Sequence, residues 1–313
     1  MTNNIAFVFP GQGSQEVGMG QALAESYPLA GKLFEQADDI LDFPLSRLCF
    51  AGPEADLNDT INTQAAIFVT SMAVLQALRS AGYDVTPKYV AGHSLGEYSA
   101  YAAAGALSFE DGLRLVRERG RLMKKAGELN PGSMAAIIKL EDKVVAKICE
   151  EVITEGDGVV LQLANYNSPG QVVISGHSAA VDRAIELAEE AKAKKVSKLP
   201  ISIASHSELM RVIAGEFRDV INNTPLNLPE MPIVANINAR PLDSLQAIRE
   251  EMEGQLTSSV RWTDSVRWMI AQGITDFVEI GPKKVLSGLI RRIDKGVNTH
   301  NIRDPEDIEA LIL

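Results

Sequence analysis

The chain has 313 residues, and its 30 Lys and Arg residues against 41 Asp and Glu residues give a formal net charge of −11. This acidic balance excludes nucleic acid and anionic membrane as expected partners. Hydrophobic residues make up 46% and charged residues 23%, which is typical of a globular protein with a large core. We find no apolar run near the roughly 18 residues that span a bilayer, and no secretory leader pattern at the N-terminus. The sequence therefore predicts a cytoplasmic protein.

The first predicted strand is Ile5–Phe9, an apolar run that ends at Pro10-Gly11-Gln12-Gly13. This pattern is typical of a buried strand that enters a glycine loop, and it puts Gln12 at the strand end. An apolar stretch over residues 63–78 predicts a core helix, and residues 89–91 predict a second buried strand. Two further helices are expected, over residues 97–107 and from Ser108 to Ala126.

The segment between Pro131 and Pro200 predicts a separate small domain. Its predicted elements alternate in the order βαββαβ, which is the ferredoxin-like arrangement. The strands are expected at residues 134–140, 159–164, 171–175 and 195–199, with helices at 142–154 and 179–193. Strands then resume at Ile201, 233–237 and 276–280. We therefore predict an α/β protein with a discontinuous large domain of residues 1–127 and 201–313 and an inserted small domain of residues 128–200.

Neither cysteine, Cys49 nor Cys149, has CxxC spacing or a neighbouring histidine cluster. This pattern favours buried apolar side chains over a disulfide framework or a zinc site. We therefore expect no metal.

Gly92-His93-Ser94-Leu95-Gly96 matches G-x-S-x-G, the nucleophile elbow. A predicted strand precedes it and a predicted helix follows, which is the context that exposes a serine hydroxyl at a helix N-terminus and aims a backbone N–H at an oxyanion. We interpret Ser94 as a nucleophile. The alternative is an ordinary glycine-rich turn between a strand and a helix.

A serine nucleophile needs a base, and the chain offers His93, His177, His206 and His300. His93 is adjacent to Ser94 and should point away from it, as a structural hydrogen-bonding residue. His177 and His206 each follow a predicted strand and precede a helix, so the pattern leaves both open. We favour His206, because the chain re-enters the large domain there.

On the predicted helix that ends near Ala126, Arg119 is the one cation on the inward stripe. One interpretation is a structural arginine paired with a buried carboxylate or a helix C-terminus. The other is a receptor for a substrate carboxylate, because a guanidinium matches a carboxylate with two parallel hydrogen bonds.

These motifs, taken with others further along the chain, resemble the malonyl-CoA:acyl-carrier-protein transacylases of bacterial fatty-acid synthesis. The resemblance covers nearly the whole length. It rests on Phe9-Pro10-Gly11-Gln12-Gly13-Ser14-Gln15, Gly92-His93-Ser94-Leu95-Gly96-Glu97, Arg119-Gly120, Ala164-Asn165-Tyr166-Asn167-Ser168-Pro169, Ser205-His206-Ser207 and Gln255-Leu256 with Val260-Arg261-Trp262. It implies an α/β-hydrolase-like large domain with a ferredoxin-like insertion.

The resemblance also implies roles for single residues. Ser94 is acylated and His206 is the base, while Gln12 and the backbone N–H of Leu95 form the oxyanion hole. Arg119 holds the malonyl carboxylate.

A second set of residues has supporting roles by the same resemblance. Gln255 orients His206 through its backbone carbonyl, so no acid is needed as a third catalytic residue. Asn165 and Gln64 line the pocket or are buried structural amides, and His93 supports the site.

The implied reaction is ping-pong transfer of malonyl from malonyl-CoA through Ser94 to the phosphopantetheine thiol of acyl carrier protein, with no cofactor. A stand-alone polyketide acyltransferase or a serine thioesterase or hydrolase remains open as an alternative. The resemblance suggests a monomer, and Lys283, Lys284, Arg291 and Arg292 offer a basic patch for an acidic carrier or form a solvated helix face. Ile203-Ala204-Ser205-His206 and Thr257-Ser258-Ser259 depart from related acyltransferases, which leaves selectivity between extender units open.

Overall fold

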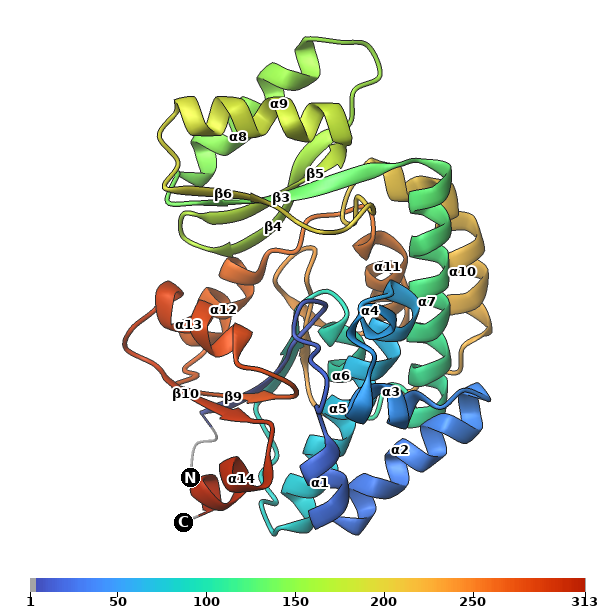
Figure 1. Ribbon diagram of the computed structural model, residues 1–313. Coiled ribbons are helices and arrows are strands. Elements are labelled where there is room, and N and C mark those ends of the chain that lie inside the picture. Colours follow the sequence, from blue (N-terminus) through green and yellow to red (C-terminus); the bar gives the residue numbers. More distant parts are fainter. Residues whose placement is uncertain (1–3, 313) are drawn as a thin grey trace.

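The computed structural model describes residues 4–312 and has a mixed α/β fold built on two sheets (Figure 1). The larger sheet has six strands in the order β10-β9-β1-β2-β7-β8. Its first five strands run parallel and β8 is antiparallel to β7. The strands are β1 (Ile5–Phe9), β2 (Tyr89–Gly92), β7 (Ile233–Val234), β8 (Pro241–Leu242), β9 (Asp276–Ile280) and β10 (Asn298–Ile302).

Helices surround the larger sheet, and several of them, α5 and α7 among them, begin with the side-chain caps that favour a helix start. The Asp59 carboxylate accepts from the backbone N–H of Ile61, and the Ser108 hydroxyl accepts from that of Asp111. The helices are α1 (Gln21–Ser26), α2 (Pro28–Leu41), α3 (Leu45–Ala51), α4 (Glu54–Leu57), α5 (Thr60–Ser80), α6 (Gly96–Ala103), α7 (Phe109–Leu129), the 3₁₀ helix η1 (Glu208–Ile213), α10 (Ala214–Asn223), α11 (Leu245–Gln255), α12 (Trp262–Ala271), α13 (Val285–Ile293) and α14 (Pro305–Ile312).

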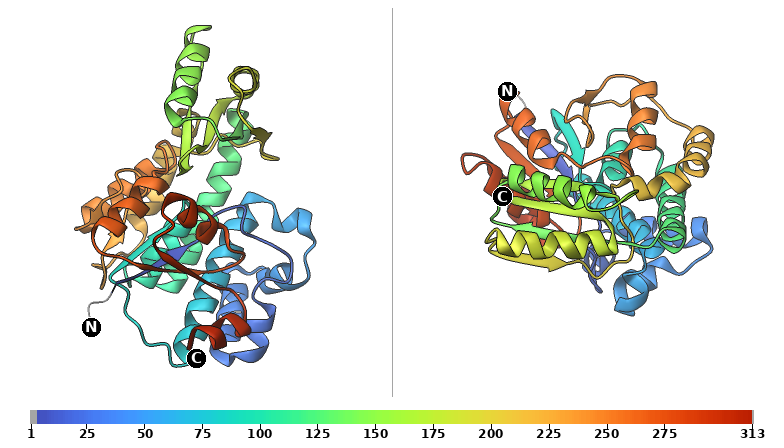
Figure 2. Two further views of the ribbon diagram at one scale, coloured as in Figure 1. Left: turned by 90° about the vertical axis from the view of Figure 1, so that its left-hand side faces the viewer. Right: turned by 90° about the horizontal axis from the view of Figure 1, so that it is seen from above.

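The predicted βαββαβ order is present in the middle of the chain, although β4 begins and ends later than predicted. These elements are β3 (Gly132–Ile138), α8 (Asp142–Thr154), β4 (Leu161–Ser168), β5 (Gln171–His177), α9 (Ser178–Glu190) and β6 (Lys195–Lys198). They form an antiparallel sheet in the order β4-β5-β3-β6. Both helices lie on the face that is turned away from the larger sheet (Figures 1 and 2). The other face is therefore free to close over the larger part of the molecule.

Hydrogen bonds join the small sheet to the segment between α11 and α12. Asn165 on β4 forms an isolated parallel bridge with Val260. The Tyr166 N–H donates to the Val260 carbonyl at 2.9 Å, and the Val260 N–H donates to the Ala164 carbonyl at 2.8 Å. This junction holds β4 beside the residues that follow Gln255.

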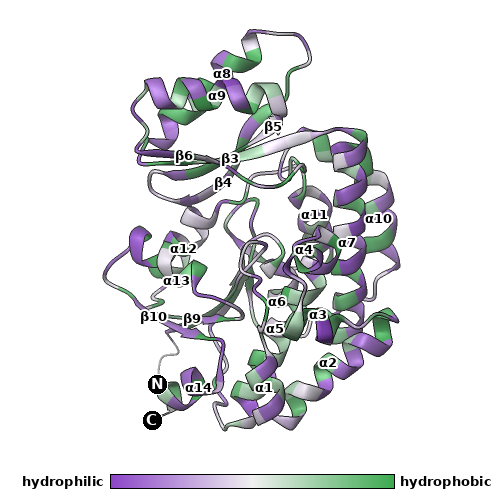
Figure 3. Ribbon diagram, viewed as in Figure 1, coloured by the Kyte–Doolittle hydropathy of each residue, from purple (hydrophilic) through white to green (hydrophobic). Residues whose placement is uncertain are grey.

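Helix α5 forms the centre of the core and corrects one expectation from the sequence. It is long and apolar enough to cross a membrane, although we expected no such run, and 83% of its 18-residue window is buried inside the molecule. The surface helices show mixed purple and green in Figure 3, as amphipathic helices do. A helix that is apolar all round needs protein on every side, and α5 has it. Cys49 and Cys149 are both buried free thiols, as predicted.

Two predicted strands of the larger sheet differ in the structure. The segment at Ile201 is irregular, and Ile201 packs against Met134, Ala164 and Val173 of the small sheet instead of pairing in the larger one. The strand predicted over residues 233–237 ends at Val234. The backbone N–H of Asn236 donates to the side chains of Glu97 and Glu251 instead of to a neighbouring strand. The third prediction, Asp276–Ile280, is confirmed.

Candidate functional site

The turn between β2 and α6 presents Ser94 at the end of the larger sheet. Ser94 has a φ of +52°, in the left-handed region that residues with a Cβ rarely adopt. The turn closes tightly around it. A Cβ on Gly92 would lie 1.9 Å from the backbone carbon of Gly96. Only glycine fits at that position, which explains the spacing of the G-x-S-x-G pattern.

His206 is the histidine that the fold brings to Ser94. Its Nε2 lies 2.8 Å from the Ser94 Oγ. Its Nδ1 lies 2.8 Å from the Gln255 carbonyl oxygen and 3.1 Å from that of Ser258. Because both partners of Nδ1 are carbonyl acceptors, we assign the ring proton to Nδ1. Nε2 is then free to accept the proton of the Ser94 hydroxyl. His206 follows an irregular segment rather than the strand that we expected.

Burial sets the protonation state of His206, which is only 3% exposed. Burial and the nearby positive charge of Arg119 lower the pKa of His206 to about 3. The imidazole is therefore neutral near pH 7 and is able to act as a base.

Arg119 on α7 is 1% exposed and its guanidinium lies beside the nucleophile. Nη2 donates to the Ser94 Oγ at 3.1 Å and to the Gln255 Oε1 at 2.8 Å, and Nη1 donates to the Gln64 Oε1 at 2.8 Å. Among residues 4–312 it forms no ion pair with a carboxylate. Burial lowers the pKa of Arg119, but a guanidinium stays charged in proteins. The structural pairing with a buried carboxylate, one of our two interpretations, is therefore not found.

Two backbone N–H groups near Ser94 lack acceptors in the described part of the chain. They belong to Leu95, which begins the turn into α6, and to Gln12 in the loop after β1. The Gln12 side chain instead donates to the Thr60 Oγ1 at 3.2 Å. Free N–H groups beside a nucleophile are what an oxyanion requires.

The remaining predicted residues lie in different places around the site. Asn165 lines the cavity from β4. Gln64 is fully buried, does not line the cavity, and donates to the Met123 sulfur at 2.9 Å. The ring of His93 turns to Asn167, with 2.7 Å between Nε2 and Oδ1, as expected for a structural residue. His177 accepts from the Val160 N–H within the small sheet, away from Ser94.

A cavity of about 360 Å³ opens above Ser94 between the two sheets. Its walls come from the loop after β1, from α4 and α5 near their junction, and from the segment that leaves β6. The residues that line it include Gln12, Asn58, Thr60, His93, Ser94, Met123, Met134, Asn165, Ile201, Ser205 and His206. Ser94 and His206 thus line the same cavity.

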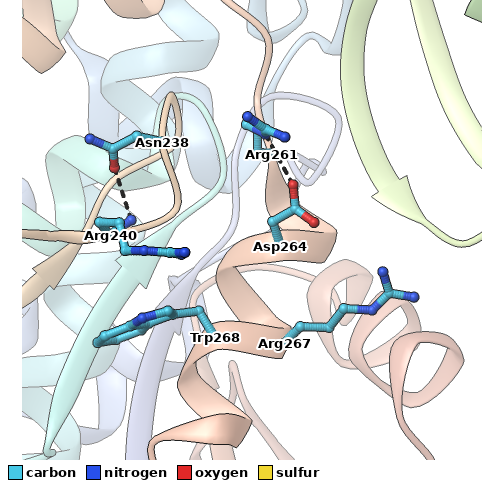
Figure 4. Close-up of a pocket in the computed structure, with 6 residues that line it drawn as sticks. All are labelled: Asn238, Arg240, Arg261, Asp264, Arg267 and Trp268. Atoms are coloured by element: carbon cyan, nitrogen blue, oxygen red, sulfur yellow. Dashed lines mark hydrogen bonds and ion pairs between the residues drawn. The ribbon is translucent and has the colours of Figure 1, made fainter.

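A second hollow, of about 340 Å³, lies beside α12 (Figure 4). Three arginines and a tryptophan dominate its lining, and Arg261 pairs with Asp264 at 3.0 Å. No serine, cysteine or histidine is among its lining residues. It lacks the groups for nucleophilic chemistry, so the Ser94 cavity is the candidate active site.

Sequence reasoning missed three buried residues beneath Ser94. Glu97, Asn236 and Glu251 are at most 4% exposed and hydrogen-bond with one another and with the turn. Burial and mutual repulsion raise the pKa of Glu97 well above its usual range, and burial raises that of Glu251 to about 7. Two features of the sequence point to these residues. Glu97 is an acid in a predicted helix of small residues, and Asn236 is an amide within the apolar run at residues 233–237.

Comparison with known proteins shows the family of the chain. The family model described as acyl transferase domain matches residues 6–304. The chain belongs to the acyl transferase domain family. It is 43% identical over 310 residues to the malonyl CoA-acyl carrier protein transacylase of Bacillus subtilis, which covers 99% of this chain and 96% of that protein.

Solved structures of malonyl transacylases are similar to this chain over nearly its whole length. The malonyl-CoA:acyl carrier protein transacylase of Xanthomonas oryzae is 42% identical with a TM-score of 0.94, covering 99% of this chain and 97% of the other. A malonyl-transacylase in complex with a type II PKS acyl-carrier protein is 38% identical with a TM-score of 0.94, covering 98% of both chains. These structures share the mixed α/β fold with a parallel sheet.

The close approach of the Gly96 backbone to Gly92 predicts that Gly92→Ala destabilises the protein. The added Cβ meets backbone atoms that cannot rotate away, so we expect a loss of about 3 kcal/mol or more in the free energy of unfolding. Gly288→Ala is the matched control, because Gly288 lies in α13 with nothing within 4 Å of the added Cβ. That substitution should stabilise the protein by about 0.5–1 kcal/mol. Urea unfolding measures both, and equal stability of the two variants would contradict the strained turn.

The lowered pKa of His206 predicts how the reactivity of Ser94 depends on pH. The neutral base predominates above about pH 3, so the rate of Ser94 labelling by a small fluorophosphonate should stay level from pH 7 to pH 5. With a histidine of ordinary pKa near 6.5, the rate would fall about 25-fold over that range. Circular dichroism at each pH checks that the protein stays folded. A fall in rate centred near pH 6.5 would contradict the buried, neutral base.

Proposed function

We propose that this protein transfers malonyl from malonyl-CoA to the phosphopantetheine thiol of acyl carrier protein through an acyl-serine on Ser94. One observation carries the proposal. The Ser94 Oγ lies 2.8 Å from the Nε2 of a neutral, buried histidine and 3.1 Å from a buried arginine that has no carboxylate partner among the described residues. The first contact suits a nucleophile and its base, and the second suits an acyl group that ends in a carboxylate.

In the first half of the reaction, His206 Nε2 takes the proton from the Ser94 Oγ as it attacks the thioester carbon. The bond from Oγ to carbon forms, the bond from carbon to sulfur breaks, and CoA leaves as a thiol with the proton that His206 returns. The carbonyl of Gln255 keeps the second nitrogen of the imidazole protonated and fixes the ring. In the second half, the carrier thiol repeats these steps in reverse and takes malonyl from Ser94.

The oxyanion of each tetrahedral intermediate is held by the backbone N–H groups of Leu95 and Gln12. We assign the backbone of Gln12 rather than its side chain, because the side-chain amide already donates to Thr60. Two backbone donors stabilise the negative charge without any group having to move. The thioester is itself an activated acyl group, so the proposed reaction needs no cofactor.

We also propose the finer description of the fold and its setting. Residues 1–127 and 201–313 form an α/β-hydrolase-like catalytic domain, and residues 128–200 form a ferredoxin-like insertion that covers the site. The antiparallel order β4-β5-β3-β6 supports the second description. We expect a cytoplasmic monomer.

The basic residues near α13 offer a docking surface for the carrier. The Lys283 ammonium lies 3.5 Å from the Gly13 carbonyl, at the loop that lines the cavity, and Arg292 bonds to Gln171 of the small sheet. The two cations therefore lie along one edge of the junction between the sheets. An acidic carrier docked there would present its thiol near the opening.

Intact-mass measurement tests the proposed function directly. Malonyl-CoA should add one malonyl group to the protein, and added carrier protein should remove it and gain the same mass. Ser94→Ala is the matched variant, and it should fold normally and gain no mass, because the hydroxyl contributes little to packing. Loss of the group to water without gain on the carrier would favour a hydrolase. A malonylated Ser94→Ala protein would place the nucleophile elsewhere.

Substitution of Arg119 tests how the substrate is selected. Arg119→Ala leaves a malonyl carboxylate desolvated without a counter-ion, which costs roughly 3–5 kcal/mol. Malonyl transfer should therefore fall by about two to three orders of magnitude, while acetyl transfer persists or improves. Measuring both rates together with the melting temperature separates binding from structure. Equal losses with both substrates and a lower melting temperature would make Arg119 a structural residue.

A further inference from the structure

We propose that Glu97 is a positioning residue for acylation, because its carboxylate holds the two side-chain amides that fix the backbone of Ser94 on either side. This inference rests on the proposed function of Ser94 as the acylated residue. It adds a buried acid that lies below the serine rather than beside the histidine.

Asn236 fixes the N–H side of Ser94. Its Oδ1 accepts from the Ser94 backbone N–H at 2.8 Å, and its Nδ2 donates to the Gly92 carbonyl at 2.7 Å. The same Nδ2 and the backbone N–H of Asn236 both donate to the Glu97 Oε1 at 2.8 Å. Glu97 therefore sets the orientation of the amide that grips the turn.

Gln255 fixes the carbonyl side of Ser94. Its Nε2 donates to the Ser94 carbonyl at 3.1 Å and to the Glu97 Oε2 at 2.5 Å. Its Oε1 accepts from Arg119, and its backbone carbonyl accepts from His206. The residue that Glu97 holds on this side thus also contacts the cation and orients the base.

A carboxyl group, with two acceptor oxygens, suits this position better than an amide. Glu97 accepts N–H groups at both of its oxygens, whereas glutamine has only one oxygen and would turn an NH₂ group toward another donor. Ser94 stands in the left-handed region, which its surroundings must maintain. Both contacts to its backbone run through Glu97, so one substitution should loosen the nucleophile without touching substrate.

A second buried acid, Glu251, lies next to this arrangement. Its Oε1 accepts from the backbone N–H groups of Asn236 and Ile237 at 2.9 and 2.8 Å. No N–H of the described residues donates to its Oε2, so that oxygen can accept the proton that burial and repulsion favour on Glu97. A protonated carboxyl group keeps a lone pair on each oxygen, so Glu97 still accepts from both amides.

The test compares Glu97→Gln with Glu279→Gln. Glu279 is an equally buried acid on β9 of the larger sheet, where its oxygens accept from the N–H groups of Leu286 and Ser287, and it has no hydrogen bond to the site. The measurements are the rate and half-saturation of Ser94 malonylation, the rate of labelling by a small fluorophosphonate, and the melting temperature. Glu97→Gln should slow both reactions by on the order of 10- to 100-fold with unchanged half-saturation by malonyl-CoA. Glu279→Gln should lower only the melting temperature.

Three results would overturn the proposal. They are wild-type rates for Glu97→Gln, equal rate losses in both variants, and a raised half-saturation with an unchanged maximal rate. If Glu97→Gln does not fold, Asn236→Ala must give the same slowing of both reactions, and wild-type rates for it would overturn the proposal as well. A wild-type protein that is never malonylated refutes the proposed function instead, and fluorophosphonate labelling still tests the role of Glu97.

Discussion

The site depends on a buried positive charge that the protein does not neutralise with an acid of its own in direct contact. The Arg119 guanidinium is held by amide oxygens, by the nucleophile hydroxyl and by the Met123 sulfur. An isolated buried charge is costly, so neutral partners of this kind leave a strong preference for an anion that enters the cavity. Burial is the larger cause of the lowered pKa of His206, and the same positive charge lowers it further. Arg119 therefore acts on both the anion that the cavity favours and the protonation state of His206.

Gln255 and Glu97 keep Arg119, the Ser94 backbone and His206 in place relative to one another. Gln255 contacts the cation with its side-chain oxygen, the serine backbone with its amide nitrogen, and the base with its backbone carbonyl. Glu97 in turn holds Gln255 and Asn236. Because these contacts are linked, a change in one of them shifts the others, and preorganised sites lose activity when such supports loosen. This linkage explains why an acid below the turn can matter to chemistry that takes place above it.

Much of this site follows from local sequence patterns. A strand, a glycine-flanked serine and a helix occur within residues 89–103, and helical spacing alone puts Arg119 on the inward face. The buried acids were missed because their partners are distant: Asn236 lies 139 positions after Glu97, and Gln255 lies 158 positions after it. The strand predicted at Ile201 was wrong for a similar reason, since its apolar side chain packs against distant residues of the small sheet, Met134, Ala164 and Val173. Catalytic roles, domain limits and the monomeric state remain predictions.

A crystal structure of the malonylated protein tests the central claim most directly. We predict that both malonyl carboxylate oxygens lie about 2.7–2.9 Å from the two Nη atoms of Arg119. The thioester-derived carbonyl oxygen should face the backbone N–H groups of Leu95 and Gln12, with the Ser94 N–H still bonded to Asn236. A malonyl group whose carboxylate points to solvent, while Arg119 keeps its bonds to Gln64 and Gln255, would contradict it.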